Sequence, residues 1–156
     1  MSRVRPAFLR RLARLSAREW RDLAEAQLEL LIAKAVVATR PTGQLISRAP
    51  DEEAHSQHEG PAAVADPRVE QLALAIGRAA EHGVFRPLCL VRAVALKRLL
   101  DRHGFTGSMV RFGVRIERGR FAAHAWVAYG SAILGDQEWH VDSFTEFEGV
   151  TVVDHA

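Results

Sequence analysis

The sequence predicts an α+β fold in which a buried central helix packs on an antiparallel sheet, preceded by N-terminal helices. Apolar residues recur at helical spacing in residues 3–40 and again in residues 67–100. After Gly104 they alternate with polar residues, which is typical of half-buried strands. The 156 residues, 48% of them hydrophobic, suffice for one core but are few for two.

The expected domain boundaries follow from a break in these patterns. Residues 41–66 contain three prolines, an acidic cluster and no usable period, so they are predicted to form a linker or surface loop. Residues 1–40 would then be a helical extension, and residues 67–156 would form the main domain. His55 and His58 lie in the loop, but they lack the cysteine or carboxylate neighbours that a metal site needs.

Charge and cysteine content narrow the classes of partner and compartment. A net charge of +2 does not by itself require nucleic acid, and we expect no nucleic-acid partner. The single cysteine fits a reducing cytosol, and no secretory signal is visible, so a cytoplasmic protein is expected. The apolar run Leu28–Ala38 is too short and too charged for stable membrane insertion.

The N-terminal segment is predicted to form two helices. Ser16 and Glu19 have the spacing of a capping box, which would begin the second helix. The first of these helices is basic and amphipathic. Its basic face either docks on an acidic partner or membrane surface, or is simply exposed to solvent while the helix packs on the core. The arginines beside its apolar stripe are Arg3, Arg5, Arg10, Arg11, Arg14 and Arg18.

Two further helices precede the strands. The helix predicted from Asp66 to Gly83 begins with an N-cap aspartate followed by proline. The next run, Leu88 to Leu100, is apolar on most sides, as expected of a central buried helix. Its first turn contains Cys89, the only cysteine of the chain.

The position of Cys89 suggests chemistry. The unpaired N–H groups and the positive dipole end of a helix N-terminus favour a thiolate, which is the nucleophilic form of cysteine. The same amides can hold the oxyanion that forms when a carbonyl is attacked. The competing interpretation is that Cys89 is a small buried hydrophobic residue, the commoner role of a lone cysteine.

His124 and Asp136 are predicted to meet across two neighbouring strands. A three-residue connection at residues 129–131 would place Ala128 opposite Ala132, and therefore His124 opposite Asp136. A two-residue turn would put Asp136 on the wrong face. The predicted strands are residues 108–116, 120–128 and 132–139, with a last one within residues 141–153.

Cys89, His124 and Asp136 then have the types and order of a nucleophile, a base and an orienting acid. His140 with Asp142 is a second candidate base pair, but it lies farther from the small residues around His124. A zinc site formed by Cys89, His124 and His140 lacks any paired-ligand spacing. No metal and no cofactor are therefore expected.

Three segments carry a family resemblance: CLVRAVALKRLLDRHG from Cys89, FAAHAWV around His124, and a GD ending at Asp136. Over residues 67–156 the chain resembles the transglutaminase-like cysteine peptidases that remove leader peptides in lasso-peptide biosynthesis. The resemblance implies a papain-like fold in which Cys89 is the nucleophile, His124 the general base and acid, and Asp136 the orienting residue. Where the wider group often has a glutamine, this chain has Arg86, Pro87 and Leu88, which leaves the second oxyanion donor undefined.

The resemblance also implies partners. The substrate would be the leader of a lasso precursor, and the freed amine would pass to an ATP-dependent lasso cyclase. Residues 1–40 lack the strand pattern of a leader-binding domain, so a separate leader-binding recognition protein is implied. Two alternatives remain open, namely a catalytically inactive peptide-binding module and a transglutaminase that transfers acyl groups to amines.

Overall fold

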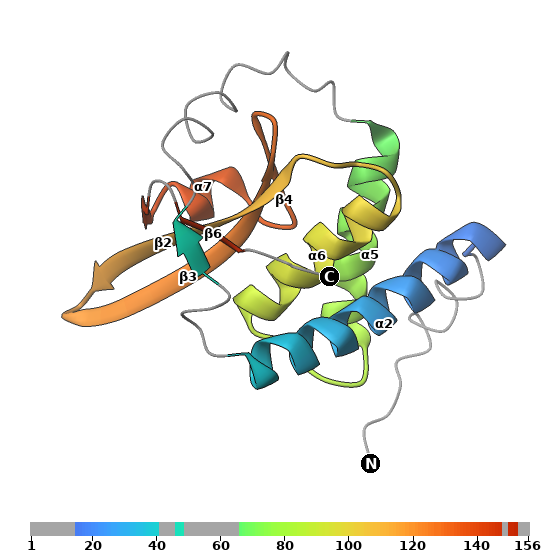
Figure 1. Cartoon of the computed structure of the whole chain (residues 1–156), viewed down its shortest axis with the longest axis horizontal. Helices are drawn as coiled ribbons and strands as arrows, with labels where there is room; N and C mark the ends of the chain where they lie inside the picture. The colour runs from blue at the N-terminus through green and yellow to red at the C-terminus, as the bar shows by residue number, and fades with distance from the viewer. Residues whose placement is uncertain (1–14, 41–45, 49–65, 148–149, 153–156) are drawn as a thin grey trace.

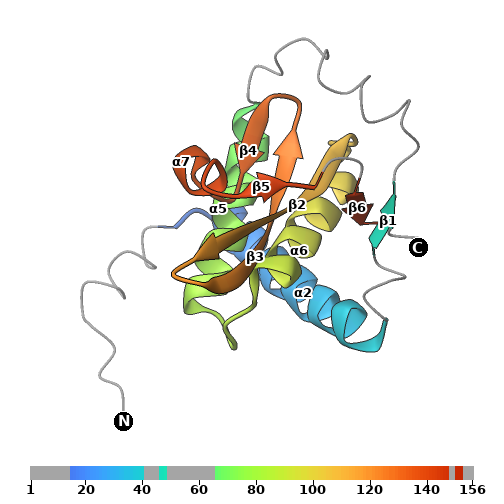
Figure 2. The same ribbon diagram turned by 90° about the vertical axis from the view of Figure 1, so that its left-hand side faces the viewer.

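The computed structural model describes residues 15–40, 46–48, 66–147 and 150–152. Three long helices, α2, α5 and α6, gather on one side of a small antiparallel sheet, and a long hairpin of β2 and β3 extends away from them (Figures 1 and 2). The helix α6 (Cys89–Arg102) packs against both other helices and against β2 and β3. The predicted α+β class with a buried central helix is therefore confirmed.

The helix α2 (Ala17–Thr39) begins at the predicted capping box. The backbone N–H of Ser16 donates to Glu19 Oε2 over 2.8 Å, and the N–H of Glu19 donates back to the Ser16 hydroxyl over 3.3 Å. Ala26, Leu30 and Ala33 on its inner face are fully buried against α5 and α6. The helix predicted before Ser16 lies outside the described residues.

Buried ion pairs fasten α2 to its two neighbours. Asp22 accepts two hydrogen bonds from the guanidinium of Arg68 on α5, at 2.5 and 2.7 Å. Glu29 is fully buried, and its carboxylate accepts from Arg98 at 3.0 Å and from Arg102 at 2.5 Å, both on α6. A segment expected as an extension thus packs into the same core as the two following helices; the domain boundaries themselves stay a prediction.

The remaining helices begin where the sequence predicts. In α5 (Pro67–His82), Asp66 caps the first turn by accepting from the N–H of Arg68 over 2.8 Å, and Gly83 follows the last residue. The N-cap of α6 is Leu88, which makes Cys89 its first helical residue. Seven apolar residues of α6 are buried: Val91, Ala93, Val94, Ala95, Leu96, Leu99 and Leu100.

The larger sheet has the order β4-β3-β2-β5 in the part of the chain that the structure describes. Its strands are β2 (Ser108–Glu117), β3 (Arg120–Tyr129), β4 (Ala132–Leu134) and β5 (Thr145–Glu146). A separate antiparallel pair joins β1 (Ile46–Arg48) to β6 (Val150–Val152). The segment predicted to be a linker therefore contains a short strand.

Two predicted features of the third strand are wrong. The strand β4 ends at Leu134 rather than Trp139, and a short helix α7 (Glu138–Val141) follows it. The connection from β3 has two residues, since Tyr129 pairs with Ala132. The positive φ of Gly130, 57°, suits the first central position of a type II′ turn, which matches the twist of a hairpin.

Among the residues that the structure describes, no helix is long and apolar enough to cross a bilayer.

Candidate active site

Cys89 occupies the first position of α6, where the backbone N–H groups have no partner inside the helix. No side chain accepts a hydrogen bond at this N-terminus, and the first turn contains no acidic residue. The thiol is half-buried and is not part of a disulfide. The backbone amides and the positive dipole end of α6 therefore lie at the residue that carries the sulfur.

Cys89, His124 and Asp136 line one narrow cavity between α6 and the sheet. All three sequence-predicted site residues therefore line the same cavity, and among the described residues only His124 and Asp136 are in hydrogen-bond contact with each other. The remaining walls are mostly apolar and come from α5, α6, β3 and β4: Ile76, Gly77, Ala93, Leu96, Ala125, Trp126, Val127, Leu134 and Gly135, with Arg92 as the only cation. An apolar enclosure of this kind strengthens the electrostatic interactions inside it.

His124 and Asp136 form a direct hydrogen bond. Nε2 of His124 donates to Oδ2 of Asp136 over 2.5 Å, which leaves Nδ1 of the imidazole for another partner. The other carboxylate oxygen accepts from the N–H of Gln137 at 2.8 Å and from Nδ1 of His140 at 3.0 Å. Burial raises the pKa of Asp136, but these hydrogen bonds outweigh it and hold that pKa below its ordinary value of 3.8.

Asp136 reaches His124 by a different route from the one predicted. In the observed register a continued strand would put Asp136 opposite Ala125, with its side chain on the face away from His124. Instead β4 stops at Leu134, and Gly135 adopts a φ of 74°, which L-residues rarely adopt. The chain turns there and brings Asp136 back to the imidazole.

Aromatic rings fix the plane of the His124 imidazole. Phe144 stacks on it with ring centroids 5.1 Å apart, and His140 meets it edge-on at 4.8 Å. Gly113 lies opposite His124 on β2, where a Cβ atom would come within 2.9 Å of both Phe144 and Trp126. Sequence reasoning missed the roles of Gly113 and Phe144, and only a strand glycine, which often marks a close approach, could have signalled the first.

The two alternative arrangements are not found. The His140 ring turns to Asp136, and the described residues show no hydrogen bond or ion pair between that ring and the carboxylate of the exposed Asp142, whose backbone N–H alone donates to the carbonyl of His140. His124, Asp136 and His140 have ligand-type atoms within 4.8 Å of one another, but Cys89 does not belong to this group. Nε2 of His124 and Nδ1 of His140 both hydrogen-bond to the Asp136 carboxylate.

A cysteine at a helix start that shares a cavity with a histidine–carboxylate pair is an arrangement of thiol-dependent acyl-transfer enzymes. The sequence profile of the transglutaminase-like superfamily matches residues 30–148, which include all three of these residues. The chain belongs to the transglutaminase-like superfamily, which includes cysteine peptidases and transglutaminases and whose members are typically cysteine-dependent enzymes. Neither curated proteins nor solved structures gave a significant match.

Proposed function

We propose that this protein is a cysteine peptidase that cleaves the leader peptide from a ribosomally made lasso-peptide precursor. The observation that carries the chemical part of the proposal is the shared cavity of Cys89, His124 and Asp136, with His124 already hydrogen-bonded to Asp136. The choice of substrate rests on the resemblance of the segments around these residues to leader peptidases.

The arrangement supports acyl transfer in two steps. Nδ1 of His124 takes the proton of the Cys89 thiol, and the thiolate attacks the carbonyl carbon of the last leader residue. The backbone amides at the start of α6 stabilise the oxyanion. His124 then protonates the departing amine of the core peptide, and water releases the leader as a carboxylic acid. Asp136, whose pKa is lowered, stays ionised and stabilises the imidazolium.

Partners follow from the same proposal. A separate leader-binding protein would deliver the precursor, and an ATP-dependent cyclase would use the freed amine. The purified chain alone is expected to cleave slowly, and addition of the leader-binding protein is expected to accelerate cleavage. Fast cleavage by the chain alone, unchanged by that protein, would remove the recognition partner from the proposal.

The decisive experiment incubates the precursor peptide with wild type, Cys89→Ala, His124→Ala and Asp136→Asn, and follows the products by mass spectrometry. Loss of activity in the first two variants and a drop of about 100-fold or more in the third are expected, because an amide cannot stabilise the imidazolium. Full activity of Cys89→Ala would refute the peptidase.

The alternatives give different results in the same experiment. A transglutaminase would join an added amine to a glutamine, which changes the mass of the substrate without cleaving it. An inactive binding module would bind the precursor and leave it intact, and its thiol would react slowly with alkylating agents near neutral pH.

A further inference from the structure

A second, larger groove lies beside the cavity of the candidate site, between α5 and β4. Its walls include Leu74, an exposed apolar residue on α5, and Ile133 on β4. The two hollows adjoin, because five residues line both of them: Gly77, Arg92, Leu134, Gly135 and Asp136. A ligand lying in the groove would therefore extend to the thiol.

One wall of this groove is the free edge of a sheet. Among the described residues β4 pairs only with β3, so its other edge faces the groove. Pairs in an antiparallel ladder alternate, and the pair of Tyr129 with Ala132 closes a two-residue hairpin and is the hydrogen-bonded kind. It follows that the N–H and C=O of Ile133 point away from β3, toward the groove. An extended peptide is the ligand that such an edge accepts.

Arg92 is the cation at the inner end of the groove, where the carboxylate of Asp136 also lies. It follows Cys89 by three residues, so the two side chains lie on the same face of α6. Arg92 is half-buried, and in the described part of the chain its guanidinium has no hydrogen bond and no ion pair. A half-buried cation without a partner is costly unless a ligand supplies the anion.

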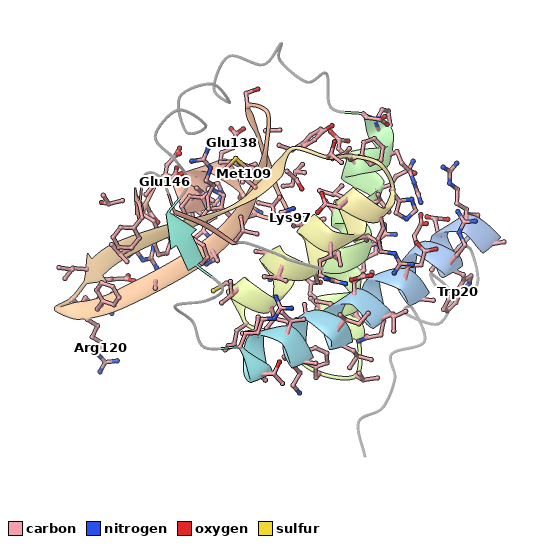
Figure 3. The ribbon with its side chains drawn as sticks, viewed as in Figure 1. Trp20, Lys97, Met109, Arg120, Glu138 and Glu146 are labelled. Carbon is pink, nitrogen blue, oxygen red and sulfur yellow. The ribbon has the colours of Figure 1, made fainter. Side chains whose placement is uncertain are left out.

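The exposed rim of the groove is mainly acidic. Glu70 and Glu81 come from the two ends of α5, with Arg78 between them, and Glu138, labelled in Figure 3, comes from α7. Near the thiol the carboxylate of Asp136 is occupied by His124 and His140, so the groove presents the cation of Arg92 there and an excess of carboxylates on its rim. A peptide that complements it has an acidic group near the reacting bond and basic groups farther along.

We infer that the groove between α5 and β4 binds a segment of the peptide substrate as a strand added to β4, and that Arg92 pairs with a carboxylate of that peptide close to the bond attacked. The inference rests on the proposed function, because it takes the substrate to be a peptide. It adds the binding mode and the charge selectivity.

The first test needs no peptide. Iodoacetate and iodoacetamide both alkylate Cys89, as the thiolate forms an S–C bond and iodide leaves, but only iodoacetate carries a negative charge. The ratio of the iodoacetate rate to the iodoacetamide rate is expected to fall about fivefold in Arg92→Met and to be largely kept in Arg92→Lys. An unchanged ratio in Arg92→Met would overturn the role of Arg92. Because this ratio does not depend on cleavage, it stands even if the peptidase proposal fails.

The second test measures binding of a fluorescent peptide spanning the leader–core junction of the precursor, with Cys89→Ala as the background. Ile133→Pro removes only the groove-facing N–H from the backbone, and Ile133→Ala is its control for the lost side chain. The proline variant is expected to bind about threefold to tenfold more weakly than the alanine variant. Equal affinity of the two variants would overturn the added strand.

A third test compares two leucine variants and serves if Ile133→Pro does not fold. Leu74→Asp places a charge on the opposite wall of the groove, whereas Leu28→Asp changes an equally exposed leucine on α2, outside it. Weaker peptide binding in Leu74→Asp alone supports the groove. Equal binding in both variants contradicts it. Cleavage of the precursor by wild type, measured alongside, reports separately on the proposed function.

Discussion

Gly135 provides the local geometry on which the pair of His124 and Asp136 depends. An alanine there would have to adopt a φ of 74°, and its Cβ would lie 3.2 Å from Leu96 Cδ2. The backbone strain costs about 1–2 kcal/mol in the folded state. The chain can relieve it only by changing the turn that directs Asp136, so a substitution of this glycine acts on the site as well as on stability.

Gly135→Ala is therefore expected to lower the free energy of unfolding by about 1–2 kcal/mol and to reduce the cleavage rate by about tenfold or more. Gly119→Ala is the matched control, because Gly119 has the same φ of 74° at the tip of the β2–β3 hairpin with no atom near its Cβ position. The control is expected to lose similar stability and to keep its activity. Equal loss of activity in both variants would separate Gly135 from the site.

His140 holds the second oxygen of Asp136, and its substitution tests whether it positions that carboxylate or acts as the base. His140→Phe removes one donor, so the pKa of Asp136 rises, and the acid limb of the pH profile of kcat/KM moves to higher pH. The rate at neutral pH is expected to fall by about tenfold or less. A loss as complete as that of His124→Ala would make His140 the base, while Asp142→Asn should change nothing.

At the scale of elements, the helix starts were predictable because they depend on local chemistry. The capping box of Ser16 with Glu19 and the N-cap of Asp66 are read from neighbouring residues, and the structure has both. The end of β4 was predicted wrongly, at Trp139, because the backbone turns at Gly135 through a φ that residue types alone do not fix. The sequence thus led to the carboxylate that His124 contacts, but through a wrong register.

The pair of Asp22 with Arg68 joins α2 to α5 and makes stability depend on pH. The hydrogen bond from Arg68 lowers the pKa of the buried Asp22 below its ordinary value of 3.8. A carboxyl whose pKa is lower in the folded state contributes stability above its unfolded pKa and loses that contribution as pH falls through its folded pKa. The contribution is therefore present at neutral pH and is lost in acid.

Asp22→Asn is expected to lower the free energy of unfolding at pH 7 by about 3 kcal/mol, because Arg68 keeps its burial without an anion. The difference from wild type should shrink as pH falls below about 4. Urea unfolding at several pH values measures this difference in the free energy of unfolding. Asp101→Asn, which breaks a more exposed pair with Lys97, should cost less than about 1 kcal/mol. A pH-independent difference for Asp22→Asn would contradict the assignment.

At the scale of the whole molecule, packing against α2 could not be read from the sequence. Its inner face is formed by small and apolar residues that would suit an independent helix equally well, and only contacts across 46 to 73 positions of sequence fix its place. The order of the strands in the sheet also depends on contacts between residues that are far apart in the sequence. Residue types and settings identify Cys89 and His124 as candidates, whereas Gly113 and Phe144 depend on the folded arrangement.

A chain of residues 67–156 alone is expected not to fold cooperatively. Without α2, the faces of α5 and α6 that pack on Ala26, Leu30 and Ala33 would be exposed to solvent. The arginines that pair with Asp22 and Glu29 would also lose these carboxylates. Such a loss is comparable with the total stability of a small domain, about 5–15 kcal/mol. Near-ultraviolet circular dichroism and thermal unfolding measure it against a chain of residues 15–156. A sharp unfolding transition in the shorter chain would contradict this expectation.

The two ends of α6 have different tasks. Its first residue is the thiol, and its last two turns are clamped to the buried carboxylate of Glu29 by Arg98 and Arg102. The helix is about 21 Å long and unbroken, so displacement at one end is transmitted to the other. A substitution that shifts α2 would therefore also act on the position of Cys89, which links α2 to a cavity that none of its described residues lines.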